Sequence, residues 1–236
     1  MKILGHRGAA GTSPENTLLS FAKGLEFGVD GFEFDVQLSR DGEIVICHDE
    51  RVDRTSDGVG WIKDFTLKEL KKLNFGVEFH TYAPIPTLAE LLEMLKGKSL
   101  TLNVELKTGL IEYPGIVGKV TRLLEEYQVS PQCIISSFEH KTIVEVIENY
   151  PEFNTGLLYA CGAIAPWIYA QNLGASNLHP HLAFVTPELV RESHVRGIGI
   201  HTWTVDEPWE MERVAISGVD IVITNYPERF IQKVPD

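Results

Sequence analysis

The feature that most constrains the fold is a regular alternation of short apolar segments with longer amphipathic segments. This alternation is typical of parallel strands joined by crossover helices. Because eight strand–helix units close a TIM (β/α)8 barrel, we predict that α/β fold, with residues 1–236 forming a single domain. The eight predicted strands cover residues 2–6, 31–39, 100–107, 133–138, 155–159, 175–180, 198–205 and 220–225.

Capping residues indicate where several helices begin. Ser13 is predicted to cap the first helix, with Pro14 at the first helical position. Thr87 and Glu90 have the spacing of a capping box for the helix before the third strand. Asp206 is predicted to cap the helix that follows the seventh strand.

The segment after the second strand interrupts the alternation. The letters SRDGE indicate a turn between two strand-like runs, so residues 43–49 are expected to return as an antiparallel hairpin strand. With DG as a two-residue turn, counting outward places Asp35 opposite His48, on the same face and about 5 Å away. The chain from about 50 to 86 is then expected to form an insertion over one end of the barrel.

Two predicted strands carry polar residues on one face and apolar residues on the other. Glu33 and Asp35 alternate with apolar residues in GFEFDVQLS, and Glu105 and Lys107 do so in LNVELK. Alternate side chains of a strand share a face, and the apolar faces should pack against the helices. The carboxylates should therefore point toward the barrel axis, near the C-terminal strand ends where barrel active sites lie.

The three inward carboxylates Glu33, Asp35 and Glu105 would repel one another strongly in a poorly hydrated barrel mouth. One divalent cation bound between them would remove this repulsion. Oxygen ligands favour Mg²⁺ or Ca²⁺, with Mn²⁺ as a further candidate, over zinc. With Arg7 and Lys107 included, such a site carries one net positive charge, which a phosphodiester anion would neutralise.

Two histidines are expected at the same end of the barrel. His6 ends the first strand and His48 lies on the hairpin. Imidazoles on both sides of a phosphate suit removal of a proton from an attacking hydroxyl and delivery of a proton to a leaving alkoxide. The sequence leaves open which histidine is the acid. Trp203, at a later strand end, is either a core residue or an apolar pocket wall together with Phe138.

Charge and composition exclude several classes of protein. A formal net charge of −12 disfavours general affinity for nucleic acid or anionic membranes. No apolar stretch approaches the roughly 18 residues of a membrane span, and no apolar leader follows Met1, so a cytoplasmic protein is expected. Cys47, Cys133 and Cys161 lack metal-site spacing and are expected to be reduced. The oligomeric state cannot be read from the sequence.

A series of motifs in this chain resembles, in order, those of the glycerophosphodiester phosphodiesterases. They are GHRGAAGTSPENT, GFEFDVQLSRDGEIVICHD, DRTSDGVG, IPTLAE, VELK, SSF, HTWTV and ITNYP, and they span nearly the whole chain. The resemblance implies a TIM barrel that hydrolyses glycerophosphodiesters, the deacylated phospholipid headgroups, to sn-glycerol 3-phosphate and an alcohol. It also allows a route in which the neighbouring glycerol hydroxyl attacks first and gives a cyclic phosphate.

The resemblance also implies roles for individual residues. The family's metal ligands match Glu33, Asp35 and Glu105, and its acid–base pair matches His6 and His48. Its phosphate contacts and their polar supports match Arg7, Lys107, Glu15 and Asn16. One departure is that Asp206 follows WTV where the family often has Asn, which bears on substrate contacts more than on chemistry.

Two other functions remain open. A phospholipase on a similar barrel would cleave intact lipid phosphodiesters, but it would want an apolar or basic rim for membrane docking, and none stands out. A protein that only binds glycerophosphodiesters would not need a pair of histidines for proton transfer. The enzyme that acts on the small, deacylated substrate is therefore preferred.

Overall fold

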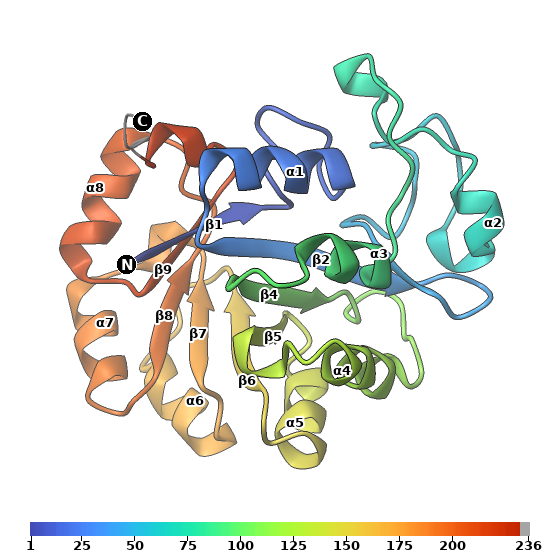
Figure 1. Ribbon diagram of the computed structural model, residues 1–236. Coiled ribbons are helices and arrows are strands. Elements are labelled where there is room, and N and C mark those ends of the chain that lie inside the picture. The colour runs from blue at the N-terminus through green and yellow to red at the C-terminus, as the bar shows by residue number, and fades with distance from the viewer. Residues whose placement is uncertain (232–236) are drawn as a thin grey trace.

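The barrel strands close into one ring, as the alternation predicts. The computed structural model describes residues 1–231. The strands of the ring are β1 (Lys2–His6), β2 (Gly31–Leu38), β4 (Thr101–Leu106), β5 (Cys133–Ser137), β6 (Asn154–Tyr159), β7 (Asn177–Pro180), β8 (Gly199–Thr202) and β9 (Ile221–Thr224). All neighbours in the ring are parallel, and β1 closes it by pairing with both β2 and β9 (Figure 1).

Helices surround this ring on its outer side (Figure 1). They are α1 (Leu18–Phe27), α3 (Leu88–Leu95), α4 (Ile116–Glu126), α5 (His140–Asn149), α6 (Pro166–Leu173), α7 (Pro187–His194) and α8 (Pro208–Ser217). None of the helices within residues 1–231 is long and apolar enough to cross a membrane.

The largest apolar cluster lies between the ring and the helices. Phe21 of α1 packs edge to face against Phe32 and Phe34 of β2, with ring centroids 5.2 and 5.8 Å apart. The apolar face of β2 therefore points outward to the helices. Because side chains alternate along a strand, the polar face of β2 points to the barrel axis, as predicted.

The predicted hairpin forms, but its predicted register is wrong by one residue. β3 (Ile44–Ile46) is antiparallel to β2, and Asp35 lies opposite Cys47 rather than His48, with the Cys47 N–H donating to the Asp35 carbonyl at 3.0 Å. The Ser39 N–H donates to the Glu43 carbonyl, so the turn has three residues, the last a glycine at φ 78°. A left-handed glycine at the end of a three-residue turn is a common hairpin geometry, and it shifts the pairing by one.

Two of the predicted helix starts are wrong. Thr17 rather than Ser13 caps α1, because Asn16 has a φ of 57° that an α-helix cannot include. Glu207 rather than Asp206 caps α8, and the Asp206 side chain contacts the end of β9 instead. The capping box predicted for α3 is confirmed.

The chain between the hairpin and α3 stands beside the arrowheads of β2 and β4, cyan to green in Figure 1. It includes the short helix α2 (Leu67–Leu70). A small apolar cluster beneath it shares Val45 and Cys47 with the hairpin. The organisation as a single domain with an insertion at about 50 to 86 stays a prediction.

Candidate active site

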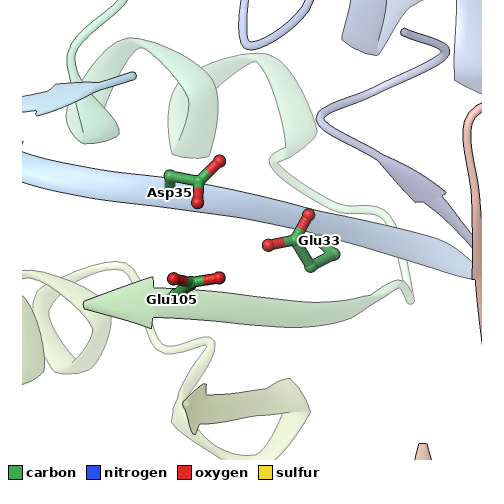
Figure 2. Close-up of side chains that lie close together, drawn as sticks. All are labelled: Glu33, Asp35 and Glu105. Carbon is green, nitrogen blue, oxygen red and sulfur yellow. The ribbon is translucent and has the colours of Figure 1, made fainter. Parts of the chain in front are cut away.

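Three carboxylates meet at the C-terminal ends of the neighbouring strands β2 and β4. Asp35 lies beside Glu105 in the parallel register, and Glu33 is two residues earlier on β2. One oxygen atom from each carboxylate lies within 4.8 Å of the other two, and all three side chains are buried. Figure 2 shows the carboxylates turned toward the same space between the two strands. This is the arrangement that the strand alternation predicts.

The carboxylates disfavour one another's charge. Burial, followed by the charges of the other two, raises the pKa of Glu33 well above its ordinary value, and burial and Asp35 raise the pKa of Glu105. Burial also opposes ionisation of Asp35, but neighbouring cationic groups, Arg7 first, outweigh it and lower its pKa. Glu33 Oε2 and Asp35 Oδ1 have no hydrogen-bond partner. Buried, unpartnered carboxylate oxygens are costly unless a cation binds them.

The three carboxylates could hold one metal ion. The ligand set consists of oxygen atoms, which fits a hard divalent cation such as Mg²⁺ or Ca²⁺. The two orphaned oxygens belong to two of these three residues, so the unsatisfied acceptors coincide with the ligand set.

Arg7 and Lys107 place positive charge at the carboxylates. Lys107 Nζ lies 3.0 Å from Glu105 Oε1 and 4.0 Å from Asp35 Oδ1. Arg7 Nε lies 3.5 Å from Asp35 Oδ2, and Arg7 Nη1 donates to Glu15 Oε1 at 2.9 Å. Burial opposes the charge of both side chains, but the carboxylates beside them raise the pKa of each. Both therefore remain cationic at neutral pH.

The loop after β1 holds two predicted site residues in an unusual backbone conformation. Arg7 and Asn16 have φ values of 51° and 57°. The Asn16 N–H donates to the Arg7 carbonyl at 2.9 Å, and Asn16 Nδ2 donates to Asp35 Oδ2 at 2.9 Å. Left-handed conformations of non-glycine residues cost about 1–3 kcal/mol each and cluster at functional sites. The strained loop aligns Arg7 and Asn16 with the same carboxylate.

His6 lies at the end of β1, and its two ring nitrogens meet different groups. Nε2 lies 3.6 Å from Glu33 Oε2, and Nδ1 lies 2.7 Å from Asn225 Oδ1. Burial, followed by the charge of Arg7, lowers the pKa of His6 to about 4. The imidazole is therefore neutral at neutral pH.

His48 reaches the site from the loop after β3, not from a strand position opposite Asp35. The Gln37 amide nitrogen holds this loop, with its two hydrogens shared among the carbonyl oxygens of Cys47, His48 and Asp49 at 2.9, 3.2 and 2.8 Å. His48 Nδ1 lies 2.6 Å from Asp49 Oδ1, and this contact lowers the pKa of Asp49. The inward face of β2 thus supplies an amide that anchors the histidine loop.

Both histidines line one pocket that also has an aromatic wall. The rings of Phe138 and Trp203 meet edge to face with centroids 5.5 Å apart, which places Trp203 at the pocket. Asn103 also lines it, is 1% exposed, and has no hydrogen-bond partner for either side-chain polar atom. A larger cavity of about 510 Å³ opens at the opposite end of the barrel and is lined by none of the three carboxylates.

The two histidines are supported by Asp49, Arg54 and Asn225, which have no role in the sequence analysis, and by Asp206, which was predicted only as a helix cap and a residue that bears on substrate contacts. On one side Arg54 Nε donates to Asp49 Oδ2 at 2.7 Å, and Arg54 Nη1 donates to Glu15 Oε2 at 2.8 Å. On the other side Asn225 Nδ2 donates to Asp206 Oδ2 at 2.7 Å. The motif DRTSDGVG contains Arg54, and Asn225 ends a strand, but neither pattern indicates these contacts.

A barrel whose C-terminal mouth gathers an acidic cluster, two cationic side chains and two histidines has the layout of a phosphoric diester hydrolase. The chain belongs to the glycerophosphoryl diester phosphodiesterase family, which it matches over residues 6–229. A glycerophosphodiester phosphodiesterase of Caldanaerobacter subterraneus is 43% identical over 235 residues, which cover 98% of this chain and 97% of the relative. One of Bacillus altitudinis is 34% identical over 237 residues and covers the same shares.

Solved structures agree with this assignment. An Oleispira antarctica phosphodiesterase in complex with the product sn-glycerol-3-phosphate is 29% identical, with a TM-score of 0.88 over 97% of this chain and 94% of that chain. A glycerophosphodiester phosphodiesterase of Thermotoga maritima is 29% identical, with a TM-score of 0.80 over 98% and 97%. The predicted TIM barrel and the predicted family are both confirmed.

Proposed function

We propose that this chain hydrolyses glycerophosphodiesters to sn-glycerol 3-phosphate and an alcohol, with a bound divalent metal and with His6 and His48 as the proton-transfer pair. The observation that carries the proposal is the convergence of three buried carboxylates, two cationic side chains and two imidazoles at one barrel mouth. The product named for the Oleispira relative supports the substrate class.

Glu33, Asp35 and Glu105 would hold the cation, Mg²⁺ or Ca²⁺. When bound, it would supply positive charge that stabilises the phosphate oxygens in the transition state. Arg7 and Lys107 add fixed positive charge at the same oxygens, in a site where burial strengthens every electrostatic interaction.

The surroundings of the two rings favour different roles. His6 Nδ1 meets an amide oxygen, so its hydrogen is on Nδ1 and the Nε2 lone pair is free to accept a proton from the attacking hydroxyl. His48 Nδ1 meets the Asp49 carboxylate, which stabilises an imidazolium. His48 then donates its Nε2 proton to the leaving alkoxide as the new phosphorus–oxygen bond forms and the old one breaks. Attack by water gives sn-glycerol 3-phosphate directly. Attack by the neighbouring glycerol hydroxyl gives a cyclic phosphate, which water must then open, with the two histidines exchanging the roles of base and acid.

The remaining pocket residues bind and orient. Phe138 and Trp203 offer an apolar wall for the glycerol carbons. Glu15 holds the Arg7 guanidinium, and Asn16 holds Asp35, through the hydrogen bonds described above. These contacts keep the charged groups aligned before substrate arrives, which lowers the reorganisation that the reaction needs.

A coupled assay for released glycerol 3-phosphate tests the proposal, with glycerophosphocholine as substrate. We expect turnover that EDTA abolishes and that added Mg²⁺ or Ca²⁺ restores. Intact phosphatidylcholine vesicles in a parallel arm, assayed for released choline and phosphocholine, should give no product. Turnover that survives exhaustive metal removal would overturn the metal requirement, binding without turnover would favour a binding protein, and preferred cleavage of the vesicles would favour a phospholipase.

A further inference from the structure

The residue after the WTV motif, Asp206, is held firmly by groups outside the pocket. Its backbone N–H donates to Glu210 Oε2 at 3.1 Å, and its carbonyl accepts from Arg229 Nη1 at 2.8 Å. Glu207 caps α8, so the Asp206 carboxylate is not used at the helix start. The Asp206 side chain is therefore available for hydrogen bonds to the residues at the end of β9.

The Asp206 carboxylate fixes Asn225 at two points. Oδ1 accepts from the Asn225 backbone N–H at 2.8 Å and from Thr224 Oγ1 at 3.2 Å, and Oδ2 accepts from Asn225 Nδ2 at 2.7 Å. An ionised carboxylate can accept hydrogen bonds but cannot donate them. The amide nitrogen of Asn225 must therefore face Asp206, and its amide oxygen must face the other way.

The amide oxygen meets the catalytic ring. Asn225 Oδ1 lies 2.7 Å from His6 Nδ1, and because an amide oxygen cannot donate, the ring hydrogen must be on Nδ1. Nε2 then keeps its lone pair. The atom nearest to it on the carboxylate cluster, Glu33 Oε2, is 3.6 Å away and beyond hydrogen-bond distance, so it does not compete for that hydrogen.

We infer that Asp206 is a positioning residue, which sets the tautomer of His6 through the amide orientation of Asn225. The inference rests on the proposed function only in making His6 the base; the chain of hydrogen bonds is independent of activity. With the amide reversed, the Asn225 NH₂ group would oppose Nδ1 and drive the ring hydrogen to Nε2. His6 would then present a donor where the reaction needs an acceptor.

Asp206→Asn tests the inference because it keeps the size of the side chain but replaces one acceptor by a donor. The readout is the ¹⁵N NMR spectrum of the imidazole nitrogens in metal-free protein labelled on histidine, at pH 8, with the His6 signals identified by His6→Gln. Wild type should show a protonated Nδ1 and an unprotonated Nε2. In Asp206→Asn the form protonated on Nε2 should appear. A wild-type ring protonated on Nε2, or an unchanged spectrum in the variant, would overturn the inference.

Kinetics provide the second readout. Proton transfer by a positioned group contributes about 10²- to 10⁴-fold to the rate, so a partly wrong tautomer should lower kcat about 10- to 100-fold, with KM within about twofold. Glu207→Gln is the matched control, because it removes the neighbouring negative charge without a contact to Asn225; it should leave both the tautomer and kcat unchanged. Asp206→Glu keeps an acceptor-only group and should retain the Nδ1-protonated ring.

Two further outcomes separate the inference from the proposed function. If the tautomer changes and kcat does not, Asp206 positions the ring as inferred, but His6 is not the base. If kcat falls and the tautomer does not change, the positioning inference is wrong. Should Asp206→Asn fail to give a cooperative melt, Asn225→Ala replaces it: loss of the amide oxygen must release the tautomer, and a retained Nδ1-protonated ring would overturn the inference.

Discussion

Arg54 and Asp49 form a two-point ion pair, with Nε 2.7 Å from Oδ2 and Nη2 3.0 Å from Oδ1. The same guanidinium forms two hydrogen bonds to Glu15, at 2.8 and 2.7 Å. Asp49 is the partner of His48, and Glu15 is the partner of Arg7. One residue of the segment predicted as an insertion therefore connects groups on two sides of the site, so this segment is part of the site's support.

Replacing Arg54 by alanine should lower kcat/KM about 10- to 100-fold, since displacements of catalytic groups by about 1 Å have effects of this size. Arg54→Lys should recover only part of the loss, because an ammonium cannot form both two-point contacts. Arg51→Ala is the matched control: Arg51 pairs with Asp53 and stacks on Trp61 in the same segment. Equal steady-state kinetics for the two alanine variants would contradict the prediction.

Glu33→Gln should have opposite effects on the stability of the metal-free protein and on metal binding. Removing one of three buried like charges should make the metal-free protein more stable by about 1–3 kcal/mol at pH 8. Burial and its neighbours raise the pKa of Glu33, so this advantage should shrink as the pH falls and the wild-type carboxyl takes up a proton.

Thermal unfolding in EDTA and in excess Mg²⁺ or Ca²⁺ measures both effects. The metal should raise the melting temperature of wild type, because a ligand that binds only the folded state stabilises it, and should leave Glu33→Gln little changed. Glu43→Gln, at an exposed carboxylate on the hairpin, is the control and should behave as wild type. A metal-free Glu33→Gln less stable than wild type would refute the repulsion argument.

Asn103 is a candidate substrate contact, because its buried amide lines the pocket and has no hydrogen-bond partner. A buried amide with no partner is unfavourable by about 1–3 kcal/mol, so Asn103→Leu should raise the free energy of unfolding by about that much. If the amide binds a substrate hydroxyl, KM for glycerophosphocholine should rise in the same variant. Ser136→Ala is the control, because Ser136 is another buried side chain with an unpartnered hydroxyl but does not line the pocket. Ser136→Ala should stabilise the protein without changing KM. An unchanged KM in Asn103→Leu would show that Asn103 does not bind the substrate.

The strand positions of the site could be predicted because they depend on local periodicity. A period of two along β2 and β4 is enough to place Glu33, Asp35 and Glu105 on one face, and the barrel topology then brings the two strands together. Two helix starts could not be predicted, because Ser13 and Asp206 both have capping chemistry that the folded chain does not use: Asn16, at φ 57°, delays the start of α1, and the Asp206 carboxylate contacts Asn225.

The register of the hairpin and the support of the histidines depend on interactions that no local pattern contains. A turn of two or three residues fits the letters SRDGE equally well, yet the choice shifts every pair by one. His48 still reaches the site because Gln37 holds its loop by side-chain hydrogen bonds rather than by strand pairing. Arg54 and Glu15 are 39 residues apart in sequence, so only the folded chain brings them together.

The last prediction concerns acid stability. Deep in the barrel His201 Nδ1 lies 2.8 Å from His179 Nε2, and both rings are buried. Burial lowers the pKa of His201 from 6.5 to about 4 and lowers that of His179 as well. The unfolded chain therefore binds more protons than the folded chain between pH 6.5 and about 4. Above this window the two histidines do not reduce the free energy of unfolding, and as the pH drops through it the free energy of unfolding falls. From pH 7.5 to pH 4.5, His201 alone should remove about 2–3 kcal/mol from the free energy of unfolding.

Urea titrations at these two pH values measure the effect. The free energy of unfolding of His201→Gln should fall correspondingly less than that of wild type, whereas that of His80→Asn, at an exposed position, should fall as much as that of wild type. The prediction fails if His201→Gln and wild type lose stability in parallel across this window.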